Sequence, residues 1–215
     1  MSGEIKEGKF IVLEGPDGAG STTQIKLLGK YLEEQRGLKV HVTKEPTNRL
    51  IGGLIRSLLT KDWRLDSYGT QLLFCADRAH HLQTDVEPAL AKGWYVLTDR
   101  YYPSTIIYGS MAIDETRRDG DQTDYWRLLS DINAPFRTPD LTMILEMDPK
   151  ECMRRILHSR PSTESFEHEE ALRKVMDNYR RFVSEQPNAF LIDGMGEIEQ
   201  IHARVVSVIK DYLFK

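Results

Sequence analysis

The sequence predicts an α/β fold, a five-stranded parallel sheet with helices on both faces, and three observations predict it. An apolar run at residues 10–13 is followed directly by a glycine-rich turn, which is typical of a buried parallel strand. Four further apolar segments of strand length alternate with longer helical patterns. The 215 residues, 40% of them hydrophobic, suffice for one substantial core. We therefore expect one domain over residues 1–215, connected by right-handed crossovers.

Each element is predicted from its hydrophobic period and its boundary residues. The predicted strands are 10–13, 38–44, 94–97, 141–147 and 189–192. The predicted helices are 21–36, 50–59, 68–92, 101–112, 124–132, the segment that begins at Pro149, 166–184 and 197–213. Gly37 and Gly93 end two of these helices, and Pro88 is expected to kink or divide the helix at 68–92. The polar segment 159–164, interrupted by Pro161, is expected to be an exposed mobile loop.

The turn after the first strand predicts a phosphate-binding loop over residues 14–24. Gly15, Gly18 and Gly20 carry no Cβ, so the backbone N–H groups can approach an anion at the positive end of the helix that starts at Ser21. The segment matches the pattern G-x-x-x-x-G-K-[ST] of P-loop NTPases, with Thr22 as the hydroxyl that reaches Mg²⁺. The alternative is a glycine-rich turn that binds nothing, which the flanking strand and helix disfavour.

Ser21 departs from this pattern because it stands where a P-loop has its lysine. Removing one preorganised charge or donor from a transition state typically costs about 2.7 to 4 kcal/mol. A chain that still catalyses phosphoryl transfer must therefore bring a cation from elsewhere.

Composition and charge limit the partners and the compartment. The net charge of −4 and the pI of about 5.9 provide no general basic field, so we do not expect a nucleic-acid partner. Cys75 and Cys152 show no paired spacing, which favours reduced thiols in the cytosol. Residues 1–9 lack an apolar run, and no later segment is long enough to span a membrane. We expect a soluble cytoplasmic protein without a membrane partner.

The carboxyl ends of the predicted strands bring polar residues to one crevice, where ligands of parallel sheets bind. These residues are Asp17, Glu45, Asp99 and Arg100. Phosphoryl transfer requires cations and a metal-holding carboxylate. Asp99 suits Mg²⁺ or its waters, and the Arg100 guanidinium suits a phosphate. The dipeptide alone would more often be an ordinary ion pair, but its position after a strand beside the glycine loop favours function.

An ordered set of motifs extends over almost the whole chain. They are E-G-P-D-G-A-G-S-T-T-Q at 14–24, T-K-E-P at 43–46, I-R-S-L-L at 55–59, L-L-F-C-A-D-R-A-H-H at 72–81, T-D-R-Y-Y-P-S-T-I-I-Y at 98–108, P-D-L-T-M-I-L-E-M-D-P at 139–149, R-I-L-H-S-R at 155–160 and S-F-E at 165–167. In these motifs the chain resembles the thymidylate kinase family. The resemblance implies Mg²⁺-dependent transfer of a phosphoryl group from ATP to dTMP, giving dTDP and ADP in dTTP biosynthesis. It also implies a homodimer, formed through apolar helix faces such as that of residues 72–79.

The resemblance implies a dTMP site formed by Asp17, Glu45, Arg56, Phe74, Arg78, Arg100, Ser104, Thr105 and Tyr108. In it, Phe74 stacks on thymine, and Arg78, one helical turn later, reaches an acceptor on the base edge. Asp17 meets the 3′-hydroxyl of the sugar, and Tyr108 lies where a ribose 2′-hydroxyl would project. Arg56 and Arg100 grip the acceptor phosphate. For each residue alone, a core aromatic ring or a solvated arginine would be the commoner role.

The resemblance also implies the donor side of the reaction. The implied ATP-binding residues are Gly15, Asp17, Gly18, Ala19, Gly20, Ser21, Thr22, Thr23 and Arg155. The metal is held near Thr22, Asp99 and Glu45. The catalytic residues are Ser21, Asp99, Arg100 and Arg160. Residues 154–166, approximately, resemble the lid that closes over ATP. Some relatives carry an arginine in the P-loop, but Gly18 and Ala19 leave none here, so the lid is expected to supply it, with Arg154 as a further candidate.

Two alternatives stay open at this stage. The protein could be a kinase for another nucleotide, deoxynucleotide or nucleoside. Because Ser21 has replaced the lysine, it could also be a nucleotide-binding protein without catalysis.

Overall fold

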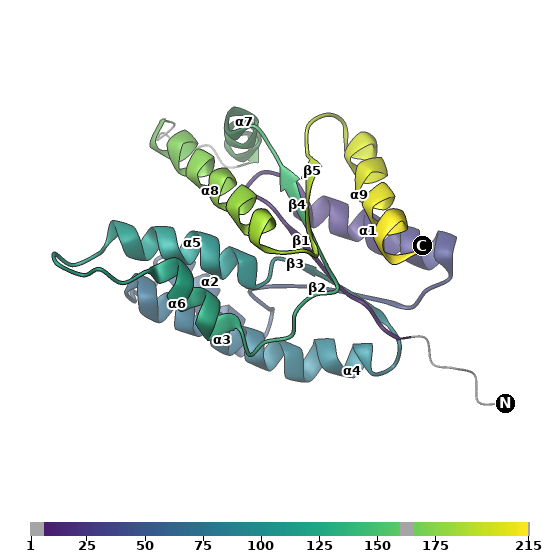
Figure 1. The fold of residues 1–215 in the computed structure, drawn as a ribbon, viewed down its shortest axis with the longest axis horizontal. Helices are drawn as coiled ribbons and strands as arrows, with labels where there is room; N and C mark the ends of the chain where they lie inside the picture. Colours follow the sequence, from purple (N-terminus) through teal and green to yellow (C-terminus); the bar gives the residue numbers. More distant parts are fainter. Residues whose placement is uncertain (1–6, 160–165, 215) are drawn as a thin grey trace.

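A parallel sheet forms the centre of the molecule (Figure 1). The structure is a computed structural model that describes residues 7–159 and 166–214. Within them the sheet has five strands in the order β2-β3-β1-β4-β5. The strands are β1 Phe10–Glu14, β2 Val40–Lys44, β3 Tyr95–Asp99, β4 Leu141–Glu146 and β5 Ala189–Asp193. All residues of β1 and β3 are buried, because helices cover both faces of these inner strands. The predicted fold class is confirmed.

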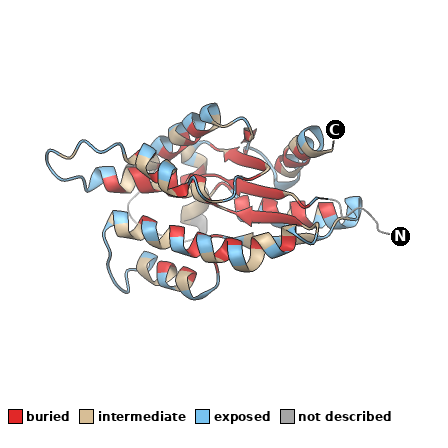
Figure 2. Ribbon diagram, turned by 60° about the horizontal axis from the view of Figure 1, so that its bottom comes forward, coloured by how far each residue is buried: buried red, intermediate tan, exposed pale blue. Residues whose placement is uncertain are grey.

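Helices pack on both faces of this sheet. They are α1 Ser21–Arg36, α2 Leu50–Leu59, α3 Ser67–His81, η1 Leu82–Val86, α4 Glu87–Leu90, α5 Tyr102–Glu115, α6 Tyr125–Asn133, α7 Pro149–Ser159, α8 Phe166–Glu185 and α9 Ile198–Leu213. Helices α1 and α9 lie together on one side, and α5 and α8 lie on the other (Figure 1). Figure 2 shows the inner strands almost wholly buried, while the helices alternate buried and exposed residues. No helix within the described residues is long and apolar enough to cross a membrane.

The predicted helix at 68–92 is present, but it is divided. Its first part, α3, continues into a π-helical turn, η1, and then into the short helix α4, which has Pro88 in its first turn. Proline has no N–H for the i−4 carbonyl, so a wider turn before it accommodates the ring without ending the helical path. Gly93, with φ 74°, then ends the segment in the left-handed region, as predicted.

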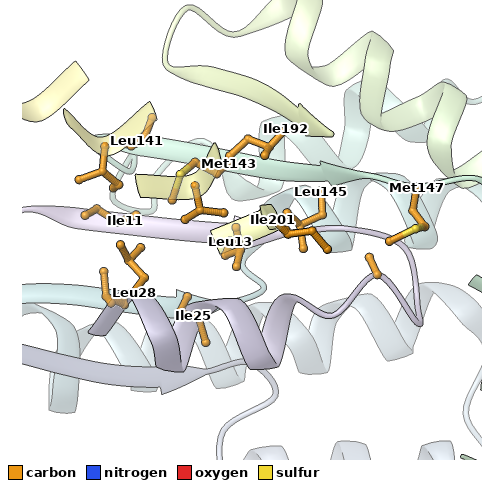
Figure 3. Packing of buried hydrophobic residues seen from close by; sticks show 14 of the residues in the cluster. Ile11, Leu13, Ile25, Leu28, Leu141, Met143, Leu145, Met147, Ile192 and Ile201 are labelled. Carbon is orange, nitrogen blue, oxygen red and sulfur yellow. The ribbon is translucent and has the colours of Figure 1, made fainter. Parts of the chain in front are cut away.

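The main core lies between the sheet and helices α1 and α9. Figure 3 shows Ile11 and Leu13 of β1 among Ile25, Leu28 and Ile201 of these two helices. Phe10 and Val12 point to the opposite face, where they pack with η1 and α4. Successive side chains of a strand alternate between faces, so one short strand contributes to both layers. The sheet is thereby held rigidly between them.

The sheet register places two loops side by side at its carboxyl edge. Leu13 of β1 pairs with Asp99 of β3, and Lys44 of β2 pairs with Asp99 from the other side. Arg100 follows with φ 71°, and its N–H donates to the Leu13 carbonyl at 3.0 Å. The glycine loop that begins after Glu14 is thus adjacent to the Asp99-Arg100 segment.

Candidate active site

The glycine loop has the conformation of an anion cradle. Gly18 and Gly20 have φ 85° and 92°, in the left-handed region that favours glycine. The Gly20 carbonyl accepts the N–H groups of Thr23 and Gln24 at 3.0 and 3.1 Å, so α1 starts directly from the loop. A Cβ at Gly18 would lie 2.7 Å from the Cys152 carbonyl oxygen of α7, so only glycine fits there. The free N–H groups at the start of this helix favour an anion.

Ser21 and Thr22 both bond the carboxylate of Asp99. Ser21 Oγ donates to Asp99 Oδ1 at 2.7 Å, and Thr22 Oγ1 donates to Asp99 Oδ2. Asp99 is 8% exposed. The side chain that replaces the P-loop lysine is therefore directed at β3, where it orients the carboxylate.

The oxygen atoms of Thr22 and Asp99 are of the type that Mg²⁺ prefers. Within the described residues, no group of three or more His, Cys, Asp or Glu side chains could hold a metal by itself. A magnesium ion here would take its other ligands from phosphates and water, as is usual for Mg²⁺ at nucleotide sites.

A cavity of about 380 Å³ opens between α3 and α5, next to the glycine loop. Of the predicted dTMP residues, it is lined by Asp17, Glu45, Phe74, Arg78, Arg100, Ser104, Thr105 and Tyr108. The structure thus brings together eight residues from four separate motifs. Arg56 does not line the cavity; its guanidinium donates to the Thr47 carbonyl nearby.

Arg78 is fixed by a buried network at the inner end of this cavity. Its Nε donates to Glu45 Oε2 at 3.0 Å, its Nη2 donates to Thr105 Oγ1 at 3.0 Å, and its Nη1 donates to Asn133 Oδ1. Arg78 is 1% exposed, so its charge requires the Glu45 partner. The second Glu45 oxygen, Oε1, lies 3.0 Å from Nδ1 of the buried His81. Glu45 therefore faces Arg78 and His81. Thr22 and Asp99, the other two residues predicted near the metal, bond each other.

Arg100 joins the glycine loop to α5. Its Nη1 donates to Ser104 Oγ at 3.0 Å, and its Nη2 forms an ion pair with Asp17. The guanidinium lies 5.3 Å from the centre of the Tyr108 ring. Burial raises the pKa of Tyr108 to about 12, so its hydroxyl is neutral at physiological pH. The arginine predicted to bind phosphate is thus preorganised beside Asp17.

Glu14 is a site residue that the sequence reasoning missed. Its carboxylate is 0% exposed and accepts Tyr101 N at 2.8 Å, Ser104 Oγ at 2.7 Å and Tyr179 Oη at 2.8 Å. It thereby ties the end of β1 to the start of α5 and to α8. Burial raises the pKa of this carboxyl, and Arg100 lowers it in part. The available signal was an acidic residue inside an otherwise apolar strand.

The predicted lid is described only at its beginning. Arg155 pairs with Glu151, Nε to Oε1 at 2.8 Å, and its Nη1 lies 3.9 Å from where a Cβ of Gly20 would be. Arg154 pairs with the same glutamate and points largely to solvent. Arg160 and residues 160–165 lie outside the described part of the chain.

A family model described as thymidylate kinase matches residues 13–205. The chain belongs to the thymidylate kinase family. A probable thymidylate kinase of Pyrococcus horikoshii is 37% identical over 211 residues, 96% of this chain and 98% of the relative. A thymidylate kinase of Caldanaerobacter subterraneus subsp. tengcongensis is 33% identical over 208 residues, 96% and 97% of the two chains. A solved thymidylate kinase from Candida albicans, described as having broad substrate specificity, aligns with a TM-score of 0.76 and 25% identity over 95% and 92% of the chains.

Membership in the thymidylate kinase family confirms the predicted family, the enzyme class and the activity, ATP-dependent phosphorylation of dTMP. The relatives named here are named as kinases, so they lend no support to a binding protein without catalysis. Ser21 is a departure within the P-loop pattern of a kinase.

Proposed function

We propose that this kinase binds dTMP in the cavity between α3 and α5 and ATP on the glycine loop. The observation that carries this proposal is the single cavity that borders both Asp17 of the glycine loop and the predicted base-binding residues Phe74 and Arg78. Two phosphate-bearing molecules would then meet near Arg100, which lines the cavity and pairs with Asp17. Holding both reactants in line is the main requirement of phosphoryl transfer.

The acceptor nucleotide is held along the cavity. Phe74 stacks on the pyrimidine ring, and Arg78 donates to an acceptor on its edge, where the Glu45 pair holds the guanidinium in place. Asp17 bonds the 3′-hydroxyl of the sugar, and Tyr108 closes the space next to its 2′ carbon. The sugar phosphate reaches Arg100, with Ser104 as a further donor.

Thr22 and Asp99 would hold the magnesium ion, or its waters, against the ATP phosphates. Bound there, the ion would neutralise charge on the transferred group. Glu45, which the resemblance placed near the metal, acts instead as a positioning residue for Arg78, because Arg78 and His81 occupy both of its oxygens.

The cation that offsets the missing lysine comes from the segment that follows β4. Arg155 lies close to Gly20 and is held there by Glu151, so it can meet the ATP phosphates. Arg160 is the second candidate from the resemblance, in the lid proposed at residues 154–166. We retain residues 1–215 as one domain.

The protein forms a homodimer through the outer side of α3. Leu72, Ala76 and Ala79 are exposed there at positions i, i+4 and i+7. Tyr68 of α3 and Leu54 of the adjacent helix α2 are further exposed apolar residues. A cytoplasmic location stays a prediction from the two buried free cysteines. Nucleic acid and membrane partners are not proposed.

The activity is tested by coupled assay of ADP formation with ATP, Mg²⁺ and dTMP, using the variant Thr22→Ala/Asp99→Ala as the background. We expect dTMP-dependent turnover well above that variant. Parallel assays with dUMP, dCMP, UMP and thymidine establish the acceptor preference, which we expect to be highest for dTMP. Tight nucleotide binding without turnover would instead establish the non-catalytic alternative.

A further inference from the structure

The Gln71 side chain borders the cavity between α3 and α5. Gln71 is 6% exposed, and no hydrogen bond joins its amide to any residue in the described ranges 7–159 and 166–214. Neither amide atom is fully enclosed by the described residues, and the Gln71 side chain lines the cavity, so a bound molecule can approach the amide. An amide with so little exposed area loses most of its hydrogen bonds to water, and buried amides without a protein partner are rare. A ligand in the cavity can supply the missing partner.

Gln71 lies on the same side of α3 as the two residues proposed to bind the base. Phe74 and Arg78 follow it by three and seven positions, which places all three on one helix face. On α5, Thr105 accepts from Arg78 at 3.0 Å. Gly109, one turn further along α5, faces Gln71. A base stacked on Phe74 therefore has a polar group on either side, Arg78 and Gln71.

Gly109 makes room for this amide. A Cβ at Gly109 would lie 2.7 Å from Gln71 Cδ and 2.9 Å from Gln71 Oε1, closer than any side chain could be. Because Gly109 of α5 has no side chain, the Gln71 amide can lie in the cavity wall. The packing fixes the amide position before a ligand arrives, which reduces the entropy lost on binding.

The hydrogen-bonding edge of thymine matches these two groups. Arg78 has only donors, so it suits the O4 acceptor. The remaining edge presents N3–H as a donor and O2 as an acceptor, and a carboxamide offers the complementary oxygen and NH₂. Cytosine presents acceptors at both N3 and O2. In either orientation of the amide, the glutamine oxygen would then face an acceptor.

We propose that Gln71 is a specificity-determining residue that binds the N3–H and O2 edge of thymine, Oε1 accepting and Nε2 donating. The inference deepens the proposed function and rests on it, because it takes Phe74 as the stacking surface. Arg78 and Gln71 together select a pyrimidine with an imide edge, thymine or uracil, and reject cytosine.

Calorimetric titration of the full chain with dTMP and with dCMP tests this assignment. Gln71→Met keeps the length of the side chain and removes both polar atoms. Loss of two neutral hydrogen bonds predicts a dTMP Kd about ten- to thirtyfold higher, with the dCMP Kd changed by less than about threefold. Gln71→Glu places a second acceptor at O2 and is expected to weaken dTMP at least as much. Gln83→Met, the same change at an exposed glutamine of η1, is expected to leave both Kd values unchanged.

An unchanged dTMP Kd in Gln71→Met, or an equal loss for dTMP and dCMP, would overturn the assignment. Thermal unfolding establishes that each variant is folded. If Gln71→Met does not fold, the test uses the wild-type chain and 2-thio-dTMP, in which sulfur, a poor hydrogen-bond acceptor, replaces O2. We expect 2-thio-dTMP to bind several-fold more weakly than dTMP. A wild-type chain that neither binds nor phosphorylates dTMP would refute the proposed function itself. Normal turnover of the wild-type chain, together with an unchanged dTMP Kd in the Gln71 variants, would refute only the role of Gln71.

Discussion

Replacing Tyr179 by phenylalanine removes one donor from the buried Glu14 carboxylate. Tyr179 is 0% exposed, and its hydroxyl donates to Glu14 Oε2 at 2.8 Å. A hydrogen bond to a charged group contributes about 1.5 to 3 kcal/mol. A domain of this size loses about 2 to 4 °C in Tm per kcal/mol. We therefore expect Tyr179→Phe to lower the Tm by roughly 3 to 12 °C at neutral pH.

The pH dependence gives this prediction a definite sign. The Tyr179 hydrogen bond lowers the pKa of Glu14, although burial keeps that pKa above its ordinary value of 4.5. A bond that favours the ionised carboxyl contributes stability above the Glu14 pKa and loses that contribution as the pH falls through it. The decrease in Tm caused by Tyr179→Phe is therefore expected to be larger at pH 8 than at pH 5.

Thermal unfolding followed by circular dichroism at both pH values measures this difference. Tyr125→Phe is the matched control, because the Tyr125 hydroxyl also donates to a carboxylate, that of Asp121, which is only partly buried. We expect a much smaller decrease for the control. Equal decreases for the two variants at pH 8, or a larger effect of Tyr179→Phe at pH 5, would refute the reasoning.

Three further predictions concern other parts of the molecule. Ser21→Ala removes a hydrogen-bond donor from the buried carboxylate of Asp99 at the end of β3. It is expected to lower the free energy of unfolding by about 1.5 to 3 kcal/mol in urea titrations. An unchanged urea midpoint would contradict the hydrogen bond between Ser21 and Asp99. Gly52→Ala would place a Cβ 2.0 Å from a main-chain carbonyl oxygen and is expected to lower the Tm. Gly53→Ala, on the same helix, would place a Cβ in ordinary van der Waals contact with the Arg56 guanidinium at 3.8 Å and is expected to raise the Tm slightly. Glu45→Gln weakens the support of Arg78, so steady-state kinetics are expected to show a KM for dTMP about tenfold higher and an unchanged KM for ATP; equal changes in both would indicate a general loss of structure.

The sequence by itself determined the fold and the general location of the site. Strand and helix periods are local properties, and the five predicted strands are all present in the sheet. The glycine loop is local as well, because its conformation depends on residues without a Cβ at Gly18 and Gly20. Parallel strands then bring their carboxyl ends to one edge, which is why Asp17, Asp99 and Arg100 could be expected together.

Only the tertiary structure decided which polar groups face one another. Glu45, Thr105 and Asn133 are 27 to 55 residues from Arg78 in the chain, and their convergence on one guanidinium depends on how α3, α5 and α6 pack. The same holds for Ser21, whose hydroxyl could have faced the nucleotide but bonds Asp99. A hydrogen bond requires its two atoms to be within about 3 Å, and such distances between separate elements are set by core packing rather than by local sequence.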